Sequence, residues 1–359
     1  MSSLVTASAR RLRRAAGALT TPLLPEDYLG YLNPLWSTRE PRGIVDAVVP
    51  ETADAATIWL RTPHGWPDHV PGQYVRVGVE VNGVWHWRTY SLTSLPGRSD
   101  GRIAITVKAL PDGLVSQQLV KHTRPGTVVR LAPPSGDYVL PDPLPERLLF
   151  ITAGSGITPV AAMLRELARR GARVHVAHVH LAPTPADAIF GRELRGMVRS
   201  RAPRYMLAEH HDGRGARFTV DRLPGLVGDL DAWDAWACGP TGLLDALTEH
   251  WAALDISERL HLERFRPVVV AVSGEGGRVV FSASGKAVEN DGATPLLVAG
   301  EEAGALLPNG CRMGICNTCA GRLTAGAVCD LRTGQVHKAE GQMIRTCVSA
   351  AAGPVEIEL

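Results

Sequence analysis

Short stretches in which apolar and polar residues alternate follow one another from residue 43 to residue 140. Alternation with a period of two is typical of strands that bury one face, and turn residues separate these stretches. The expected strands are Ile44–Val49, Thr57–Arg61, Tyr74–Val79, Val84–Leu92 and Ile103–Leu110. Such a series predicts an antiparallel β-barrel or a sandwich, with one short helix after Pro111-Asp112-Gly113.

The pattern changes near residue 147, where strands and helices begin to alternate. The apolar run Leu148–Thr152 is typical of a buried parallel strand. Further elements are expected as strands at Val174–Val179, Tyr205–Glu209 and Ala235–Cys238, and as helices at Thr158–Arg169, Ala186–Val198 and Thr241–Leu254. This alternation predicts an α/β doubly wound sheet. Residues 267–359 return to short strands rich in glycine.

These changes divide the chain of 359 residues into four parts. We expect an N-terminal extension at 1–40, a β-barrel domain at 41–142, an α/β domain at 143–266 and a third domain at 267–359. Apolar residues make up 45% and charged residues 21%, as in a soluble globular protein. The formal net charge of +2 gives no sign of a nucleic-acid partner, and we expect none. With no apolar run long enough for a transmembrane helix, we expect a cytoplasmic protein.

The first 25 residues of the extension carry no acidic residue but four arginines, Arg10, Arg11, Arg13 and Arg14. A basic helix near Leu4–Leu19 suits a membrane surface or a docking partner, whereas a disordered arm explains the same composition. A mitochondrial presequence is a third interpretation. Peripheral association with the inner face of the membrane is therefore one expectation for this segment.

Five of the six cysteines lie in the last fifty residues, which favours a metal site over a disulfide framework. Cys311, Cys316 and Cys319 follow the spacing Cys-x4-Cys-x2-Cys, and Cys347 comes 27 residues later. This spacing matches the plant-type [2Fe–2S] ligand pattern, which predicts these four cysteines as the metal ligands. A structural zinc site usually has two Cys-x2-Cys pairs, and a thioredoxin-like pair usually opens a helix in a βαβ unit, so both alternatives fit poorly.

A flavin site is predicted where the barrel strand ends in Arg88-Thr89-Tyr90-Ser91. This Arg-x-Tyr-Ser motif resembles the flavin motif of the ferredoxin–NADP reductase superfamily. Arg88 suits a flavin phosphate, Tyr90 can lie against the isoalloxazine ring, and the Ser91 hydroxyl can donate to flavin N5. Downstream, Gly113, Val115 and Ser116 belong to a turn that opens a helix, and this Gly-x-x-Ser element favours FAD over FMN.

A nucleotide site is predicted where the first α/β strand meets its helix. The loop there holds Gly154, Ser155, Gly156, Thr158 and Pro159, and it can bring backbone N–H groups close to a pyrophosphate. Proline replaces the third glycine of the Rossmann fingerprint, so the loop is a variant that is similar to the same superfamily.

A second nucleotide element, Cys238-Gly239-Pro240, follows a later strand. In the superfamily that the chain resembles, this tripeptide lies beside the nicotinamide. The resemblance therefore implies a catalytic role for Cys238, in addition to that of Ser91. The alternative is a small buried cysteine at a strand end.

The choice between NADH and NADPH stays open in the sequence. The Ser-Arg pair that contacts the 2′-phosphate in many relatives is replaced by the stretch from His178 to Pro183, and Arg192 is a candidate substitute. Of the three histidines at 175, 178 and 180, only the last two share a face of a strand, so no metal site is predicted there.

Together the signatures resemble flavohaemoglobin-type ferredoxin–NADP reductases fused to a C-terminal ferredoxin. The resemblance implies FAD, a [2Fe–2S] cluster and NAD(P)H as cofactors, a β-grasp fold for the third domain, and an enzyme that transfers electrons. Hydride would pass from NAD(P)H to the flavin, and single electrons would then leave through the cluster.

The extension from Leu23 to Ser37 resembles that of actinobacterial reductases serving membrane stearoyl-CoA desaturases. This closer resemblance implies NADPH as donor and an acyl-CoA desaturase as acceptor. The alternatives are a Rieske oxygenase, a steroid hydroxylase or a cytochrome P450 as client. A redox sensor is an alternative of another class, although residues 1–40 are short for an output domain.

Overall fold

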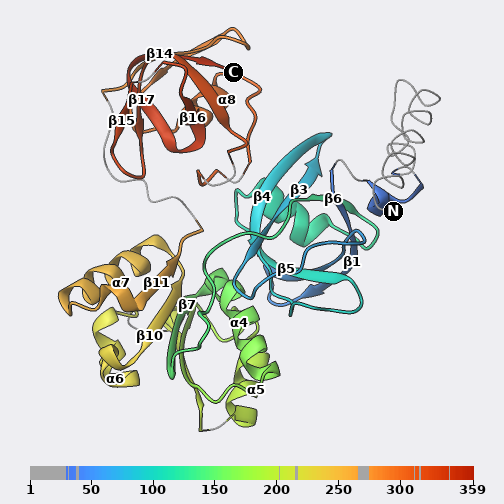
Figure 1. Ribbon diagram of the computed structural model, residues 1–359, viewed down its shortest axis with the longest axis vertical. Helices are drawn as coiled ribbons and strands as arrows, with labels where there is room; N and C mark the ends of the chain where they lie inside the picture. The colour runs from blue at the N-terminus through green and yellow to red at the C-terminus, as the bar shows by residue number, and fades with distance from the viewer. Residues whose placement is uncertain are drawn as a thin grey trace, which may run out of the picture.

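Three lobes, each built around one β-sheet, make up the computed structural model of this protein (Figure 1). It describes residues 30, 32–37, 40–201, 203–214, 217–265, 275–310, 312–314, 317–338 and 340–359. The basic segment with the four N-terminal arginines lies outside the described residues, and so do Cys311 and Cys316. None of the helices within these ranges is long and apolar enough to cross a lipid bilayer.

The first lobe is an antiparallel barrel with the strand order β4-β3-β6-β1-β2-β5. Its strands are β1 (Arg42–Pro50), β2 (Ala55–Arg61), β3 (Tyr74–Val81), β4 (Val84–Ser91), β5 (Arg102–Lys108) and β6 (Val128–Leu131). A bridge between Leu92 and Ile105 joins the two edges of the sheet and closes the barrel. Side chains of alternate positions, such as Val45, Ile58 and Val75, are fully buried inside it. The short strand β6 was not predicted from the sequence.

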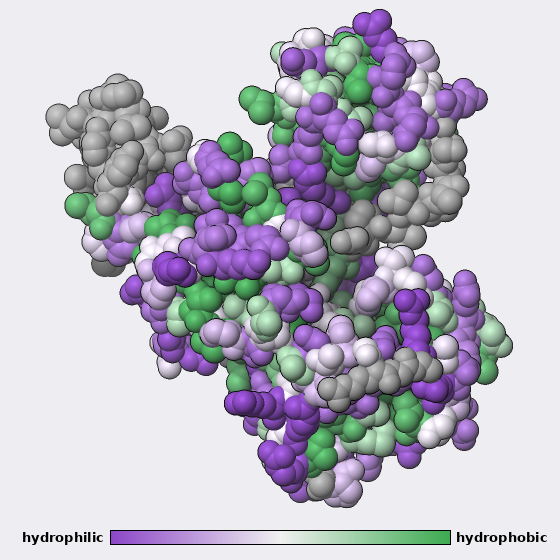
Figure 2. All heavy atoms as spheres, turned by 180° about the vertical axis from the view of Figure 1, so that it is seen from behind, coloured by the Kyte–Doolittle hydropathy of each residue, from purple (hydrophilic) through white to green (hydrophobic). Residues whose placement is uncertain are grey.

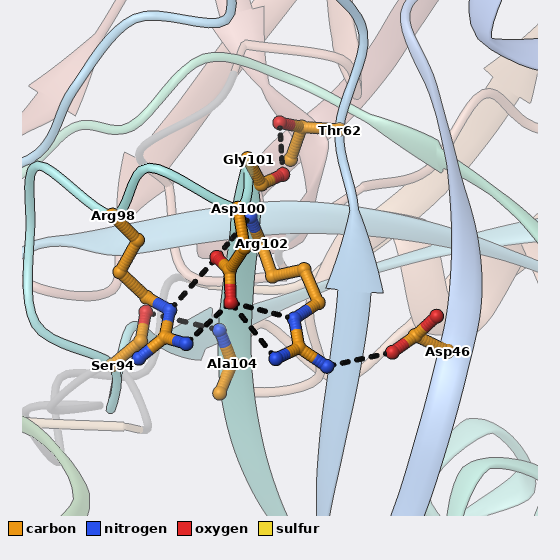
Figure 3. Close-up of polar contacts among 8 residues, drawn as sticks. All are labelled: Asp46, Thr62, Ser94, Arg98, Asp100, Gly101, Arg102 and Ala104. Atoms are coloured by element: carbon orange, nitrogen blue, oxygen red, sulfur yellow. Dashed lines mark hydrogen bonds and ion pairs between the residues drawn. The ribbon is translucent and has the colours of Figure 1, made fainter.

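The loop from β4 to β5 is held by ion pairs (Figure 3). The guanidinium groups of Arg98 and Arg102 both bind the carboxylate of Asp100, and Arg102 also reaches Asp46 on β1 at 2.8 Å. These bonds, with Arg98 contributing most, hold the pKa of Asp100 below its usual value. The Ser94 hydroxyl accepts a 3.0 Å bond from the Ala104 N–H. The segment that leaves the flavin motif is therefore fixed to β5.

The second lobe is a parallel sheet with the strand order β11-β10-β7-β8-β9. Its strands are β7 (Arg147–Ala153), β8 (His175–Ala182), β9 (Tyr205–His211), β10 (Asp234–Cys238) and β11 (Leu260–Glu263), and its helices are α4 (Ile157–Arg169), α5 (Gly191–Arg201), α6 (Leu223–Val227) and α7 (Thr241–Ala253). Phe150 of β7 packs in the core with α4 and α5, and Ile151 packs in the core with α6 and α7. Helices thus cover both faces, as a doubly wound sheet requires.

Helix α5 begins later than its sequence pattern predicts. The expected start was Ala186, but the helix begins at Gly191, because Phe190 has a positive φ of 59°, which a right-handed α-helix does not allow. Five residues of the expected helix therefore form a turn against the barrel.

The third lobe is a mixed sheet with the strand order β13-β12-β17-β14-β15, and β16 pairs with β14. Its elements are β12 (Gly277–Phe281), β13 (Lys286–Asn290), α8 (Leu296–Glu302), β14 (Ala320–Asp330), β15 (Val336–His337), β16 (Met343–Arg345) and β17 (Ser349–Glu358). Leu296 and Leu297 of α8 pack with Phe281 in the core. The predicted fold class is confirmed in all three lobes. Hydrophilic residues are interspersed with hydrophobic ones on the face shown in Figure 2.

Candidate functional site

One cavity of about 2400 Å³ is lined by residues from all three lobes. Cavities that hold a single drug-sized ligand measure about 300–1,000 Å³, so this one has room for more than one group. Most of the residues predicted from the sequence line it: Arg88, Thr89, Tyr90, Ser91, Gly113, Val115, Ser116, Gly154, Ser155, Gly156, Thr158, Gly239 and Pro240. The structure therefore brings the predicted flavin and nucleotide elements together.

The end of β4 supplies the flavin motif. Ser91 is 4% exposed, and its Oγ has no hydrogen-bond partner among the described residues. The buried hydroxyl of Thr89 lacks a partner in the same way. Burial raises the pKa of Tyr90 far above its usual value, so its phenol stays neutral. Because an unpaired buried hydroxyl is costly, this edge suits a ligand with polar atoms along a flat ring.

The turn before α3 (Leu114–Gln117) is closed by Ser116. Its hydroxyl donates to the Gly113 carbonyl at 3.0 Å and accepts from the Leu110 N–H at 3.1 Å. A Cβ at position 113 would lie 2.2 Å from that hydroxyl, so the turn requires glycine. Ser116 thus shapes this part of the cavity wall by holding the turn.

The glycine loop forms one 3-10 turn, Gly154–Gly156, between β7 and α4. Gly154 has a φ of +54°, and a Cβ on Gly156 would lie 2.0 Å from the carbonyl oxygen of Cys238. The Thr158 hydroxyl donates to the Ser155 carbonyl at 3.0 Å. Pro159 is buried in the first turn of α4 and is not one of the residues that line the cavity. The loop is therefore packed tightly against the second nucleotide element.

Cys238 itself is fully buried behind the cavity wall that Gly239 and Pro240 form. Burial, and secondarily the nearby carboxyl of Glu263, raises the pKa of the Cys238 thiol well above its usual value. The thiol therefore stays protonated. A buried, protonated thiol can pack against its neighbours and make weak polar contacts, but it is a poor nucleophile.

Glu263 and Tyr138 belong to the site, although neither was predicted from the sequence. Glu263 pairs in register with Cys238, and burial raises the pKa of its carboxyl to about 7. Both residues line the cavity, and both the Glu263 Oε2 atom and the Tyr138 hydroxyl lack a hydrogen-bond partner within the described parts of the chain. A carboxylate at the end of the last parallel strand was the available sequence signal for Glu263.

Two of the four predicted cluster ligands can be placed, Cys319 and Cys347, and both are buried. The Gly314 N–H donates to Cys347 Sγ at 3.3 Å, a bond of the kind that tunes cluster potential. The Thr346 hydroxyl donates to the Cys319 carbonyl at 2.9 Å, which ties the two cysteine segments together. Arg312 and Asn317 have positive φ values of 57° and 56°, so the loop turns sharply.

The cluster loop meets the barrel beside the flavin motif. Arg312 and Met313 of the loop line the same cavity as Arg88. On the other side, Arg76 of β3 donates to the Thr318 hydroxyl at 3.2 Å, while its guanidinium lies 5.6 Å from the centre of the Trp87 ring. The ferredoxin-type lobe is therefore placed next to the strand that carries the flavin motif.

His178 and His180 do share a face of β8, as their spacing predicts. Both rings contact the Thr152 hydroxyl at 2.8 Å, and His178 also binds the Tyr205 hydroxyl at 2.9 Å. The two histidines thus form a buried hydrogen-bonded chain in the core of the second lobe.

Comparisons with known proteins agree with this geometry. The family described as oxidoreductase FAD-binding domain matches residues 46–139, and the family described as 2Fe-2S iron-sulfur cluster binding domain matches residues 281–352. A solved structure of phthalate dioxygenase reductase is similar with a TM-score of 0.64 and 24% identity, over 89% of this chain and 98% of that one. At this identity the likeness supports the fold.

Two relatives from Mycobacterium tuberculosis are similar over most of their length. An NADPH oxidoreductase is 48% identical over 97% of this chain and 92% of its own. A 3-ketosteroid-9-alpha-monooxygenase ferredoxin reductase component is 30% identical over 78% of this chain and 84% of its own length. Three features of the site fit the groups that these families bind: the buried hydroxyls of Ser91 and Thr89, the glycine loop Gly154–Gly156, and the Gly314 N–H that donates to Cys347 Sγ. The chain belongs to the family of NAD(P)H-dependent oxidoreductases of the ferredoxin-reductase type that combine an FAD-binding domain with a [2Fe–2S] domain.

Proposed function

We propose that this enzyme takes electrons from NADPH and delivers them to an oxygen-activating partner, a membrane acyl-CoA desaturase. The observation that carries the electron route is that residues of all three lobes line one cavity. When bound, FAD accepts a hydride and releases electrons singly, and the cluster carries one electron at a time.

The chain's own residues bind and orient these groups. Arg88 and the turn at Gly113 would hold the flavin phosphates, and the Ser91 hydroxyl would donate to the flavin edge. Gly154 and Gly156 would let a pyrophosphate approach the first turn of α4. Cys311, Cys316, Cys319 and Cys347 would ligate the cluster.

Glu263 supplies a carboxyl group that can hold a proton at the end of the parallel sheet where Cys238 lies. Burial raises the pKa of its carboxyl to about 7, so a proton is held there more readily than on an exposed carboxyl, and Glu263 lines the same cavity as Tyr138. A protonated carboxyl could donate a hydrogen bond to a nicotinamide amide oxygen.

The proposal of NADPH rests on the 48% identical relative named NADPH oxidoreductase. Arg192, the candidate from the sequence, is exposed at the start of α5 and does not line the cavity, whereas Arg217 does. Steady-state kinetics with NADH and NADPH test this directly. A kcat/KM for NADH equal to or above that for NADPH would contradict the proposal.

The proposal of a desaturase rests on the resemblance of the N-terminal extension to that of reductases serving such enzymes. Peripheral association through the basic extension belongs to the same proposal, since arginines favour anionic lipid surfaces. The test is NADPH-driven desaturation of stearoyl-CoA by desaturase-containing membranes, with the purified chain added or omitted. If the added chain leaves the product yield unchanged, the proposed client is wrong.

A different oxygenase is the second candidate, because several relatives have names of that kind. One is a glycine betaine monooxygenase reductase subunit from Pseudomonas aeruginosa, 29% identical over 80% of this chain. A Rieske oxygenase or a cytochrome P450 would accept electrons by the same route. Supplying each acceptor in turn to the reduced enzyme discriminates between these clients.

The variant Cys316→Ser tests the route itself. We expect reduction of a large protein acceptor to be abolished and reduction of ferricyanide from the flavin to continue, since the ligand set loses one thiolate. Cys329→Ala is the matched control, because Cys329 is a buried cysteine outside the ligand pattern. If both activities survive in Cys316→Ser, electrons leave the enzyme by another path.

A further inference from the structure

Helix α4 joins the nucleotide loop to the flavin strand through one side chain, Arg165. The helix begins at Ile157, directly after the glycine loop, and Arg165 lies two turns further along it. Its Nη1 atom donates a short hydrogen bond to the carbonyl oxygen of Thr93. Thr93 comes two residues after Ser91, so this bond crosses from the second lobe to the end of the flavin motif.

The guanidinium of Arg165 is held from the other side by the second lobe. Its Nε and Nη2 atoms donate to the two carboxylate oxygens of Glu193 at 2.8 and 2.6 Å. Its carbon Cζ lies 4.5 Å from the centre of the Phe190 ring. A planar guanidinium with a bidentate partner and a ring beneath it has one preferred orientation, so the bond to Thr93 is directed.

The Thr93 end is equally fixed within the barrel. Thr93 is fully buried, and its N–H donates to the Ala104 carbonyl at 2.8 Å. Its hydroxyl lies 3.1 Å from that of Thr106, which lies 2.8 Å from that of Thr57. The Thr57 hydroxyl donates to Glu51 at 2.6 Å. A chain of polar groups therefore extends from Arg165 across the barrel strands.

A second contact closes this chain at Phe190. Burial raises the pKa of the Glu51 carboxyl, and a backbone hydrogen bond from the Phe190 N–H partly opposes that rise, which places the two residues in contact across the lobe boundary. Phe190 has a φ of +59°, a costly conformation for a bulky residue. Such a conformation persists where its surroundings fix it, and here Glu51 and Arg165 do so from either side.

We infer that Arg165 is a positioning residue for hydride transfer, which fixes the nucleotide loop relative to the Ser91 end of β4. This inference rests on the proposed flavin and nucleotide sites. Hydride transfer needs the two rings in contact at a defined angle, and a misplacement of about 1 Å can cost about 100-fold in rate. Arg165 is 22% exposed as a side chain and does not line the cavity, so its effect is through orientation.

The test compares Arg165→Gln with Arg169→Gln in the holoenzyme. Arg169 lies on the same helix, pairs with Glu166 at 2.6 Å and is 55% exposed, so it matches the charge change without the bond between lobes. We expect anaerobic flavin reduction by NADPH to slow about 10- to 100-fold in Arg165→Gln and to change less than about twofold in Arg169→Gln. Equal rates in the two variants would overturn the inference.

Two further measurements separate orientation from general damage. Amide hydrogen exchange should rise at residues 92–96 and 160–168 in Arg165→Gln, while the Kd for NADP⁺ and the rate of cluster reduction by dithionite stay close to wild type. Unchanged exchange at both segments counts against the inference. Arg165→Lys keeps the positive charge but loses the planar guanidinium that binds both oxygens of Glu193. It should therefore recover less than half of the rate that is lost in Arg165→Gln.

Should Arg165→Gln fail to fold, Glu193→Gln gives the same comparison, because it weakens the orientation of Arg165 and leaves the bond to Thr93 in place. We expect a smaller slowing, of about 3- to 10-fold. No slowing overturns the inference. A wild-type enzyme whose flavin is not reduced by either nicotinamide nucleotide contradicts instead the proposed function.

Discussion

Single buried polar atoms define what this site can do. Among the described residues, four that line one cavity each have a buried oxygen without a hydrogen-bond partner: Ser91, Thr89, Tyr138 and Glu263. Leaving such groups unpaired costs about 1–3 kcal/mol each, so a bound cofactor that pairs them recovers that free energy. The same buried oxygen atoms would therefore favour a ligand that offers them hydrogen-bond partners.

Ser91→Ala tests the most central of these atoms. Loss of the hydroxyl removes a donor aimed at the flavin edge, and we expect hydride transfer to slow by about 10-fold or more. Stopped-flow reduction of the flavin under anaerobic conditions measures it. Ser99→Ala, an exposed serine in the loop after β4, is the control. Equal rates for the two variants would show that Ser91 does not contact the reacting atoms.

His180 makes the stability of the second lobe depend on pH. Burial lowers the pKa of its ring from 6.5 to about 4, so the unfolded chain binds a proton that the folded chain does not. Stability is then complete above pH 6.5 and falls as pH drops from 6.5 towards 4, by at most about 3 kcal/mol.

The variant His180→Gln cannot titrate, so its free energy of unfolding should fall less between pH 7 and pH 4.5. Urea denaturation at each pH measures the difference. His175→Gln, on the same strand but exposed, should keep the wild-type slope. Parallel curves for wild type and His180→Gln would contradict this origin of the acid sensitivity.

At the scale of elements, strand ends and helix starts build the site. Strand β7 ends at the glycine loop, β10 ends at Cys238, and their neighbouring positions are in register. Gly156 lets these two ends touch, because any side chain there would meet the Cys238 carbonyl. The carboxyl edge of the parallel sheet is thus continuous from β7 to β10, as the proposed nucleotide site requires.

Gly156→Ala should therefore weaken nucleotide binding strongly. A Cβ placed 2.0 Å from a backbone oxygen forces the loop and β10 apart, and we expect the Kd for NADP⁺ to rise by about 10-fold or more. Isothermal titration measures it. Gly196→Ala in α5 is the control, since a Cβ there meets nothing nearer than 4.0 Å. An unchanged Kd would mean that the loop does not hold the pyrophosphate.

At the scale of the whole molecule, the third lobe contacts β3, the strand that pairs with β4. Arg76 lies opposite Thr89 of the flavin motif in the β3–β4 register and reaches Thr318, which lies between two predicted cluster ligands. In Figure 1 the β3–β4 hairpin lies on the side of the barrel nearest to the ferredoxin-type lobe. Arg76 thus ties the predicted cluster loop to the strand that pairs with the predicted flavin strand.

Arg76→Gln should slow electron transfer from flavin to cluster without slowing flavin reduction. The contact that places the cluster loop is lost, and the third lobe becomes less constrained. Separate absorbance changes of flavin and cluster after mixing with NADPH measure the two steps. Arg124→Gln is the control, because Arg124 is exposed and lies in the same barrel lobe as Arg76. A cluster step as fast as in wild type would show that Arg76 does not place the lobe.

Local sequence patterns predicted the barrel, the doubly wound sheet, most strands and most of the residues that line the cavity. Period-two alternation, βα alternation and the Cys-x4-Cys-x2-Cys spacing are local patterns. They can be recognised without knowing which distant residues pack against them. Arg88–Ser91, Gly154–Thr158 and Gly239–Pro240 were recognised for that reason, and all line the cavity apart from the buried Ile157.

Which distant residues come into contact depends on the tertiary structure. Glu263 joins Cys238 through strand pairing, Arg76 meets Thr318 across 242 positions, and Arg165 meets Thr93 across 72. It also buried Cys238 and Pro159 behind the wall and delayed the start of α5 to Gly191. Contacts between residues far apart in the chain depend on how the lobes pack, and no local pattern encodes that packing.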